Sequence, residues 1–187
     1  MNHVLVLEGS PRKGNTSQVV DWVLAGMGKG NKVTRVKLCE QHIQPCQECF
    51  TCTDSKKTAG CAQDDDMVEL YDKMIDADLI LWASPIFCWN VTAQTKMALD
   101  RTFALLTGED LLKDSKWALV LTAGGDAFDG ADLAVEMFRR LADYGSIKHL
   151  GQHVVAPCPD GAKLRNSAVL KKQAMQFGKE MAKALRG

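Results

Sequence analysis

The sequence predicts an α/β fold in which a parallel sheet carries helices on both faces. Three short apolar runs, at residues 4–7, 79–83 and 117–121, are typical of strands that are buried on both faces. Strand patterns and helical patterns alternate along the chain as five β/α units, and this alternation favours a parallel sheet. The chain of 187 residues has the size of one domain, and it contains no internal repeat or linker.

The first two units combine an inner strand with an outer one. Residues 4–7 are followed by a helix with apolar residues at i, i+3 and i+4 spacing over 19–27. Residues 32–38 alternate between polar and apolar side chains, as a more exposed outer strand does. A cysteine-rich loop at about 39–64 comes next, and an amphipathic helix over 67–74 follows it.

The third unit is expected to end its strand early. The strand at 79–83 should break at Ser84-Pro85, because proline favours an extended exit and cannot donate to a sheet. The helix that follows should run from Ala93 to about Leu106, with Thr92 as its N-cap.

The last two units complete the sheet. The strand at 117–121 precedes a helix that Gly145 should stop as a left-handed cap, and a final strand over 147–156 precedes a helix over 170–185. The residues of the first of these helices that should face the core are Leu133, Met137, Phe138 and Leu141. In such a sheet ligands bind at the carboxyl ends of the strands, so the chemistry should lie in the loops that begin at Gly9, Ser84 and Ala123.

Composition excludes several classes of protein. Lys and Arg total 23, and so do Asp and Glu, so the formal net charge is zero and the chain lacks the basic stripe that nucleic acids or anionic membranes require. No apolar run approaches the roughly 18 residues of a membrane span, and the first residues enter an apolar strand without a basic leader. We therefore expect a cytoplasmic protein with no nucleic-acid or membrane partner.

A loop dense in hydrogen-bond donors joins the first strand to the first helix. Gly9–Ser17 offers free helix N–H groups, together with the hydroxyls of Ser10, Thr16 and Ser17, to an anion. The loop departs from a nucleoside-triphosphate P-loop because Asn15 stands at the lysine position, and it lacks the dinucleotide pattern as well. A mononucleotide with one phosphate, such as FMN, fits this loop; the alternative is a turn with a helix cap.

Three motifs together resemble one family. Gly9–Ser17, the segment 84–101 that begins Ser-Pro-Ile-Phe-Cys-Trp-Asn, and Thr122–Asp126 resemble, in order, the flavin loops of the NADPH-dependent FMN reductase family of the flavodoxin-like superfamily. The resemblance covers about residues 4–132. It implies a flavodoxin-like three-layer α/β/α sandwich with a five-stranded parallel sheet in the order 2-1-3-4-5, and one FMN-binding domain over residues 1–187.

The resemblance implies an FMN site without a catalytic side chain. Phe87 and Trp89 would stack on the isoalloxazine ring or cover it. Gly124 and Gly125 would present N–H groups to the N1/O2 edge, on which reduction places negative charge; a glycine-rich turn without a ligand is the alternative. The candidate FMN-binding residues are Ser10, Arg12, Asn15, Thr16, Ser17, Pro85, Ile86, Phe87, Cys88, Trp89, Asn90, Thr122, Ala123, Gly124, Gly125 and Asp126.

Four of the seven cysteines form one motif. Its spacing, C-x2-C-x2-C-x8-C, lets each turn bring the next thiolate back to the same centre. The pattern resembles that of the iron–sulfur flavoproteins, a branch of the same family, in which the last gap is usually shorter than eight residues. The resemblance implies a [4Fe–4S] cluster, while a zinc site and a loop without a cluster remain open. The four candidate ligands are Cys46, Cys49, Cys52 and Cys61.

Four further residues are expected to have structural roles. Cys39 and Cys158 lie outside the motif and should be small buried side chains, and Cys88 in the second flavin loop should pack. Arg101 should be a partner in an ion pair.

Three functions remain open at this stage. We favour an FMN-dependent oxidoreductase that accepts hydride from NAD(P)H and passes electrons to a small acceptor such as a flavin or a quinone. The second is an iron–sulfur flavoprotein that relays single electrons from a ferredoxin-like partner through a [4Fe–4S] cluster to FMN. The third is a non-catalytic redox or metal sensor that uses the cysteine loop as a switch. The resemblance also implies a homodimer or a homotetramer.

Overall fold

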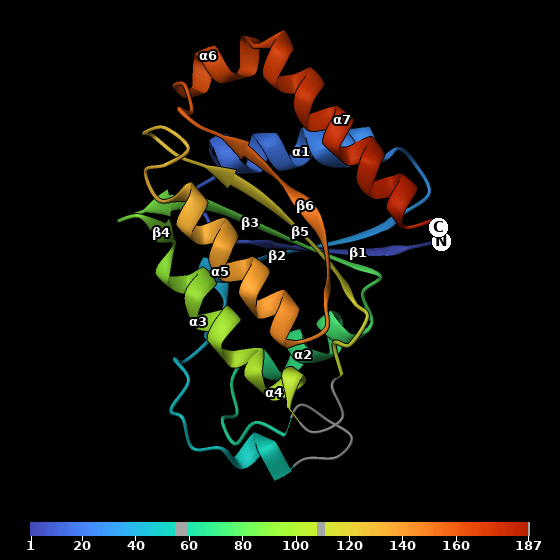
Figure 1. Cartoon of the computed structure of the whole chain (residues 1–187), viewed down its shortest axis with the longest axis vertical. Helices are drawn as coiled ribbons and strands as arrows, with labels where there is room; N and C mark the ends of the chain where they lie inside the picture. The colour runs from blue at the N-terminus through green and yellow to red at the C-terminus, as the bar shows by residue number, and fades with distance from the viewer. Residues whose placement is uncertain (55–59, 108–110, 187) are drawn as a thin grey trace.

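A sheet of five parallel strands runs through the middle of the molecule (Figure 1). The computed structural model describes residues 1–54, 60–107 and 111–186. The strands pair in the order β2-β1-β3-β5-β6, which confirms the predicted order. A sixth strand, β4, pairs only with the end of β3, in antiparallel fashion. The strands are β1 (His3–Glu8), β2 (Lys32–Lys37), β3 (Leu79–Phe87), β4 (Asn90–Val91), β5 (Lys116–Thr122) and β6 (Lys148–Val155).

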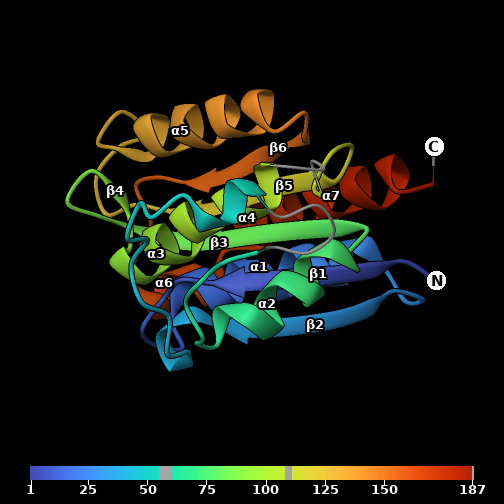
Figure 2. The same cartoon turned by 90° about the horizontal axis from the view of Figure 1, so that it is seen from below.

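Helices cover both faces of the sheet, as predicted (Figures 1 and 2). One face carries α1 (Asn15–Met27), α6 (Gly161–Asn166) and α7 (Ala168–Ala184). The other carries α2 (Met67–Ile75), α3 (Ala93–Arg101), α4 (Phe103–Leu106) and α5 (Ala131–Tyr144). Two short 3-10 helices, η1 (Leu38–Glu40) and η2 (Thr51–Asp54), belong to the segment between β2 and α2. Within the described ranges, no helix has both the length and the apolar character that crossing a membrane requires.

The inner strands contribute side chains to two separate cores. Val4 and Val6 of β1 pack on the α1 and α7 side, whereas Leu5 and Leu7 pack on the opposite side, and all four are completely buried. Alternate residues of β3 and β5 divide between the two cores in the same way. This double burial is the physical reason why the three runs are continuously apolar and do not alternate.

The third β/α unit differs from the prediction at both of its ends. Strand β3 does not break at Ser84-Pro85 but continues to Phe87, with Pro85 opposite Thr122 of β5. Thr92 precedes α3 as predicted, but it makes no side-chain cap; its hydroxyl donates instead to the carbonyl of Gly9 at 2.8 Å. The helix predicted from 93 to 106 is two helices, α3 and α4, which meet at Thr102.

Helix α5 differs from the prediction on one face and at its end. Leu133 is 54% exposed, whereas the buried face consists mainly of alanines around Phe138. Gly145 follows the helix as predicted, but its φ of −87° is not left-handed; Ser146, with a φ of 51°, has that conformation. Of the four residues predicted to face the core, only Leu133 does not: Phe138 is buried, and Met137 and Leu141 pack against the core.

Candidate functional site

A cavity of about 350 Å³ opens at the carboxyl ends of β1, β3 and β5, where the sequence places the ligand. This volume falls within the range of small-molecule sites. Ten of the candidate FMN-binding residues line it: Ser10, Arg12, Asn15, Thr16, Pro85, Ile86, Phe87, Thr122, Ala123 and Gly124. We call it the flavin cavity. Its walls bring together three loops that are far apart in the sequence.

The first loop leaves backbone donors free at the flavin cavity. Helix α1 begins after Gly14 without a side-chain cap, so the N–H groups of its first turn have no side-chain acceptor. Asn15 and Thr16 of that turn line the cavity, and Arg12 adds a positive charge to its wall. A helix N-terminus with an adjacent guanidinium is a suitable place for one phosphate.

Three hydroxyls of the first loop are hydrogen-bonded to other protein groups. The Thr16 hydroxyl lies 2.7 Å from that of Thr122 in a buried pair, so the first loop is hydrogen-bonded to the end of β5. The Ser10 hydroxyl donates to the carbonyl of Arg12 at 2.7 Å and stabilises the turn. The Ser17 hydroxyl donates to the buried carboxylate of Glu8 at 2.7 Å, and Ser17 does not line the flavin cavity.

Close packing against α3 explains why residue 9 is a glycine. A Cβ at Gly9 would lie 1.8 Å from the Thr95 hydroxyl oxygen, so the loop can approach α3 this closely only with glycine. Gly124 is different, because a Cβ there would meet nothing within 4 Å, and Gly124 lines the cavity. A Cβ at Gly125 would clash with Asp129. Gly124 is therefore the glycine whose missing side chain keeps the cavity open.

The second loop forms a hairpin whose tip lies outside the flavin cavity. Cys88 and Trp89 connect β3 to β4, and both have left-handed backbones, with φ of 47° and 62°. Two successive positive φ angles are typical of a tight two-residue hairpin turn and are strained for side chains other than glycine. Trp89 is 65% exposed and Phe87, which lines the cavity, is 46% exposed. Cys88 is also exposed, so the prediction that it packs is wrong.

Asn90, Gly125 and Asp126 do not line the flavin cavity. The side chain of Asn90 accepts from the N–H of Val91 at 2.8 Å and stabilises the hairpin. The carboxylate of Asp126 accepts from the N–H of Phe128 at 2.7 Å. In the second and third loops, the residues that directly follow the strand therefore line the cavity. The later residues instead form hydrogen bonds that stabilise the turns of the loops.

A fourth loop, which the sequence analysis did not nominate, completes the flavin cavity. Cys158, Pro159 and Asp160 follow β6 and line the cavity. Asn15 donates from its side-chain nitrogen to the carbonyl of Pro159 at 2.8 Å and to the Cys158 sulfur at 3.3 Å. Cys158 is partly buried, and this burial raises the pKa of its thiol. The sequence could have indicated this loop, because it also follows the carboxyl end of a predicted strand.

The cysteine motif lines a second cavity, of about 390 Å³. All four motif cysteines contribute to its walls, so we call it the cysteine cavity. None of its lining residues lines the flavin cavity. Its lining residues are Cys46, Gln47, Glu48, Cys49, Phe50, Cys52, Cys61, Ala62, Gln63, Asp100, Arg101, Phe103 and Ala104.

The thiols of the cysteine cavity differ in their surroundings. A hydrogen bond from the Thr51 hydroxyl lowers the pKa of the exposed Cys49 thiol, and the positive charge of Arg101 contributes in the same direction. Partial burial raises the pKa of Cys52, and the neighbouring thiols of Cys61 and Cys46 add to this effect. Cys39 does not line either cavity; it is exposed, so the prediction that it is buried is wrong.

The donor chemistry of each cavity fits the group that the motifs imply. The flavin cavity offers a helix N-terminus, a cationic side chain and an open glycine, which suit a phosphate and a flat ring. The cysteine cavity offers four thiols, the ligands that iron–sulfur clusters use. Within the described residues, however, no three metal-binding side chains already lie close enough together to hold a metal ion. Residues 55–59, in the eight-residue gap before Cys61, lie outside the described residues.

Comparison with known proteins identifies the family. The family model described as NADPH-dependent FMN reductase matches residues 2–159. An iron-sulfur flavoprotein of Methanocaldococcus jannaschii is 32% identical over 148 residues, which cover 79% of this chain and 72% of that protein. An iron-sulfur flavoprotein of Methanosarcina thermophila is 32% identical over 132 residues, which cover 70% of this chain and 67% of that protein.

Solved structures show the same fold. The NAD(P)H:quinone oxidoreductase from Methanothermobacter marburgensis superposes with a TM-score of 0.73 at 19% identity, over 96% of each chain. A WrbA-like flavodoxin from Agrobacterium tumefaciens superposes with a TM-score of 0.63 at 14% identity, over 100% of this chain and 98% of that one. The fold is therefore flavodoxin-like. The chain belongs to the NADPH-dependent FMN reductase family and is a flavin-dependent oxidoreductase.

Proposed function

We propose that this oxidoreductase is an iron–sulfur flavoprotein, which holds FMN in the flavin cavity and a [4Fe–4S] cluster on the four motif cysteines. The observation that carries the proposal is that all four cysteines line one cavity. The relatives named above support it, since their names describe iron–sulfur flavoproteins. The natural electron donor for such a protein is a ferredoxin-like partner that supplies single electrons.

Zinc is less favoured than an iron–sulfur cluster as the group bound in the cysteine cavity. Zinc sites with four cysteines usually consist of two separate C-x2-C pairs. Here Cys46, Cys49 and Cys52 follow one another at x2 spacing, and only Cys61 stands apart. Three closely spaced thiolates and a distant fourth are more typical of an iron–sulfur cluster.

The chain's own residues divide the work at the flavin cavity. Bound FMN supplies the electron-accepting chemistry that the side chains lack. The first turn of α1 and Arg12 bind the phosphate, and the N–H groups near Gly124 stabilise the negative charge that reduction places on the ring. Phe87 lies on the wall of the cavity, where its side chain would contact the ring. No side chain of the cavity is required as an acid or a base.

A second candidate is a reductase that accepts hydride from NAD(P)H and passes electrons to a small acceptor such as a flavin or a quinone. The family description as NADPH-dependent favours it. The exposed side chains of Phe87 and Trp89 also leave one side of the site accessible to a small donor and then to an acceptor. The same match to a family of reductases speaks against a non-catalytic sensor.

We also propose that the protein is cytoplasmic and assembles as a homodimer or a homotetramer. Membership of the reductase family supports this assembly, in which a neighbouring subunit would help to cover the flavin. Light scattering coupled to size-exclusion chromatography measures this assembly directly. A monomer at micromolar concentration would contradict the proposed assembly.

One anaerobic preparation separates the candidates. We expect bound FMN, and about four iron and four sulfide per chain. Reduced ferredoxin should bleach the flavin faster than NADPH does. Rapid bleaching by NADPH in a protein without iron and sulfide would favour the reductase, and a protein without FMN would contradict both candidates.

Matched cysteine variants test the cluster ligands. Replacing Cys49 or Cys52 by Ser should abolish most of the bound iron and leave FMN in place, because serine is a poor ligand for these clusters. Cys39→Ser and Cys88→Ser are the controls, since both thiols lie outside the cysteine cavity. Equal iron content in all four variants would contradict the assignment.

A further inference from the structure

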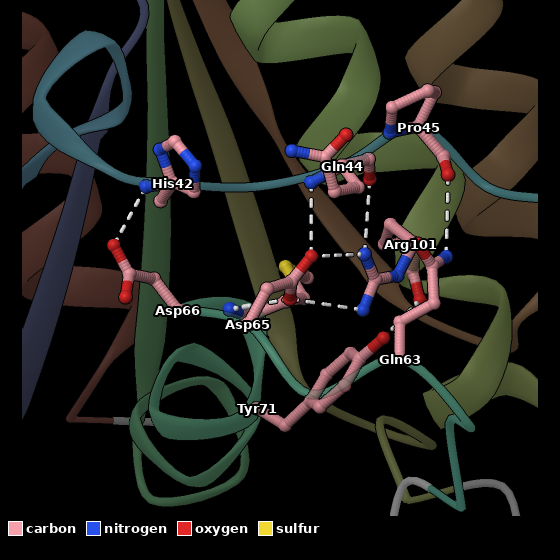
Figure 3. Close-up of polar contacts among 9 residues, drawn as sticks. His42, Gln44, Pro45, Gln63, Asp65, Asp66, Tyr71 and Arg101 are labelled. Carbon is pink, nitrogen blue, oxygen red and sulfur yellow. Dashed lines mark hydrogen bonds and ion pairs between the residues drawn. The ribbon is translucent and has the colours of Figure 1, made fainter.

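Arg101, at the end of α3, is the most deeply buried charge beside the cysteine cavity. Its side chain is 1% exposed and forms an ion pair with Asp65, whose side chain is 6% exposed (Figure 3). Nη1 and Nη2 of Arg101 donate to the two carboxylate oxygens at 2.7 and 3.1 Å. Burial is the largest single influence and lowers the pKa of the guanidinium, but hydrogen bonding to Asp65 and the interactions with Tyr71 and Cys61 together raise it. Burial also acts against the charge of Asp65, but hydrogen bonding, chiefly with Arg101, lowers the pKa of its carboxyl.

The Arg101–Asp65 ion pair joins the two ends of the cysteine loop. Nη1 of Arg101 also donates to the carbonyl of Gln44 at 2.9 Å, and the N–H of Gln44 donates to Asp65 at 2.9 Å. Gln44 precedes the first motif cysteine and Asp65 follows the last one. A side-chain N–H of Gln63 donates to the carbonyl of Pro45 at 3.2 Å, one step nearer the cysteines. Figure 3 shows the two ends of the loop side by side around the guanidinium.

The Nε–H group of the guanidinium is not used in these contacts. Among the described residues, Nε of Arg101 is buried and has no acceptor. A buried N–H without an acceptor costs about 1–3 kcal/mol, and more when the group is charged. Asp65 cannot serve as its acceptor in this arrangement, because its two oxygens already accept from Arg101, Gln44 and the N–H of Met67. The unused donor needs an acceptor that the described residues do not supply.

The cysteine cavity is where that acceptor would lie. Arg101 lines it together with all four motif cysteines. Sulfur atoms of a thiolate-bound cluster carry negative charge and accept N–H hydrogen bonds.

We propose that Arg101 is the positioning residue of the cysteine site, which holds both ends of the loop and donates its free Nε–H to a sulfur of the bound cluster. This role rests on the proposed function, because it requires that the four cysteines hold the cluster. A permanent positive charge beside the cluster stabilises the reduced form, which carries one more electron, and so raises the midpoint potential. The negative charge of Asp65 has the opposite effect, because it disfavours the reduced form and lowers the midpoint potential.

The test is a redox titration of the anaerobic holoprotein with dithionite and mediators, followed by electron paramagnetic resonance. Arg101→Gln should lower the equilibrium constant for one-electron reduction by about tenfold, or about 59 mV in midpoint potential. Arg101→Lys keeps the positive charge but loses the planar guanidinium and its paired N–H donors. The midpoint potential of this variant should therefore lie close to that of the wild type. Asp65→Asn should raise the potential. Arg139→Gln is the matched control, because Arg139 is an exposed arginine of α5 that pairs with Glu136.

Opposite shifts of the midpoint potential in the Arg101→Gln and Asp65→Asn variants support the proposed role of Arg101. If Arg101 only held the two ends of the loop together, the two variants would not shift the potential in opposite directions. Wild-type potentials in both variants, with iron and sulfide intact, would overturn the role of Arg101 alone. If Arg101→Gln loses the cluster, Asp65→Asn decides: an unshifted potential in that variant overturns the role. A wild-type protein without iron and sulfide would overturn both this role and the proposed cluster.

Discussion

The hydroxyl of Thr16, in the first turn of α1, lies 2.7 Å from the hydroxyl of Thr122 at the end of β5, and both residues are buried. The two residues are 106 positions apart in the sequence. Their hydrogen bond joins the first and third flavin loops at the wall of the flavin cavity. It sets the spacing between the helix N-terminus and the open glycine at 124.

The Thr16–Thr122 pair should show strong coupling. Thr122→Val leaves the buried Thr16 hydroxyl without its partner, which should cost about 1–3 kcal/mol in the free energy of unfolding. Thr16→Val should cost a similar amount. The double variant should cost clearly less than the sum, because no hydroxyl is then left unpaired. Urea unfolding of the four proteins measures this cycle, and strictly additive losses would show that the two hydroxyls do not interact.

Ser17 should contribute to stability and not to FMN binding. Its hydroxyl donates to the buried carboxylate of Glu8, which also accepts from Nε of Arg35 at 2.6 Å. Ser17→Ala should cost about 1–3 kcal/mol in the free energy of unfolding, since hydrogen bonds to charged groups are strong. The dissociation constant for FMN, measured by fluorescence quenching, should change less than about twofold. A weakening of about tenfold would instead return Ser17 to the phosphate site.

Two glycines should respond to alanine in opposite ways. Gly124→Ala places a methyl group in the open cavity, so it should change the unfolding free energy by less than about 0.5 kcal/mol but weaken FMN binding by about tenfold. Gly9→Ala forces a Cβ against Thr95, so it should cost about 1–3 kcal/mol of stability in the protein without flavin. Thermal unfolding and FMN titration of both variants distinguish the two roles. The reverse pattern would mean that the cavity is not the flavin site.

His153 should make the fold less stable in mild acid. Burial lowers its pKa below the ordinary value of 6.5; among the described residues its Nε2 has no partner, and its ring stacks on Phe177 at 5.8 Å. The unfolded chain therefore binds a proton at His153 more readily than the folded chain does. Stability from this group is complete above about pH 6.5 and is lost as the pH falls toward the folded pKa.

The measurement is the free energy of unfolding as a function of pH in wild type and in His153→Phe. Phenylalanine keeps a ring beside Phe177 but cannot accept a proton. The variant should lose less stability than wild type between about pH 7 and pH 5. Parallel curves for the two proteins would show that His153 does not contribute.

Local patterns were sufficient for the elements and for their order. Continuous apolar runs predicted the buried strands because both faces of a parallel sheet are covered. The donor-rich loop after the first strand and the four closely spaced cysteines were also visible, since both depend on neighbours in the sequence. The prediction failed where a side chain had a distant partner. Thr92 looks like a helix cap, but its hydroxyl donates to Gly9, 83 residues away.

The sequence by itself determined the α/β class, because periodicity is a local property of the chain, and its motifs indicated three candidate flavin loops and four candidate cluster ligands. Only the tertiary structure decided which of these residues meet. It brought a fourth loop, with Cys158, to the flavin cavity and committed Ser17 to Glu8. It also placed Arg101 and Asp65 together beneath the cysteines. Hydrogen bonds and ion pairs between distant segments depend on how the helices pack on the sheet, and no local pattern records that packing.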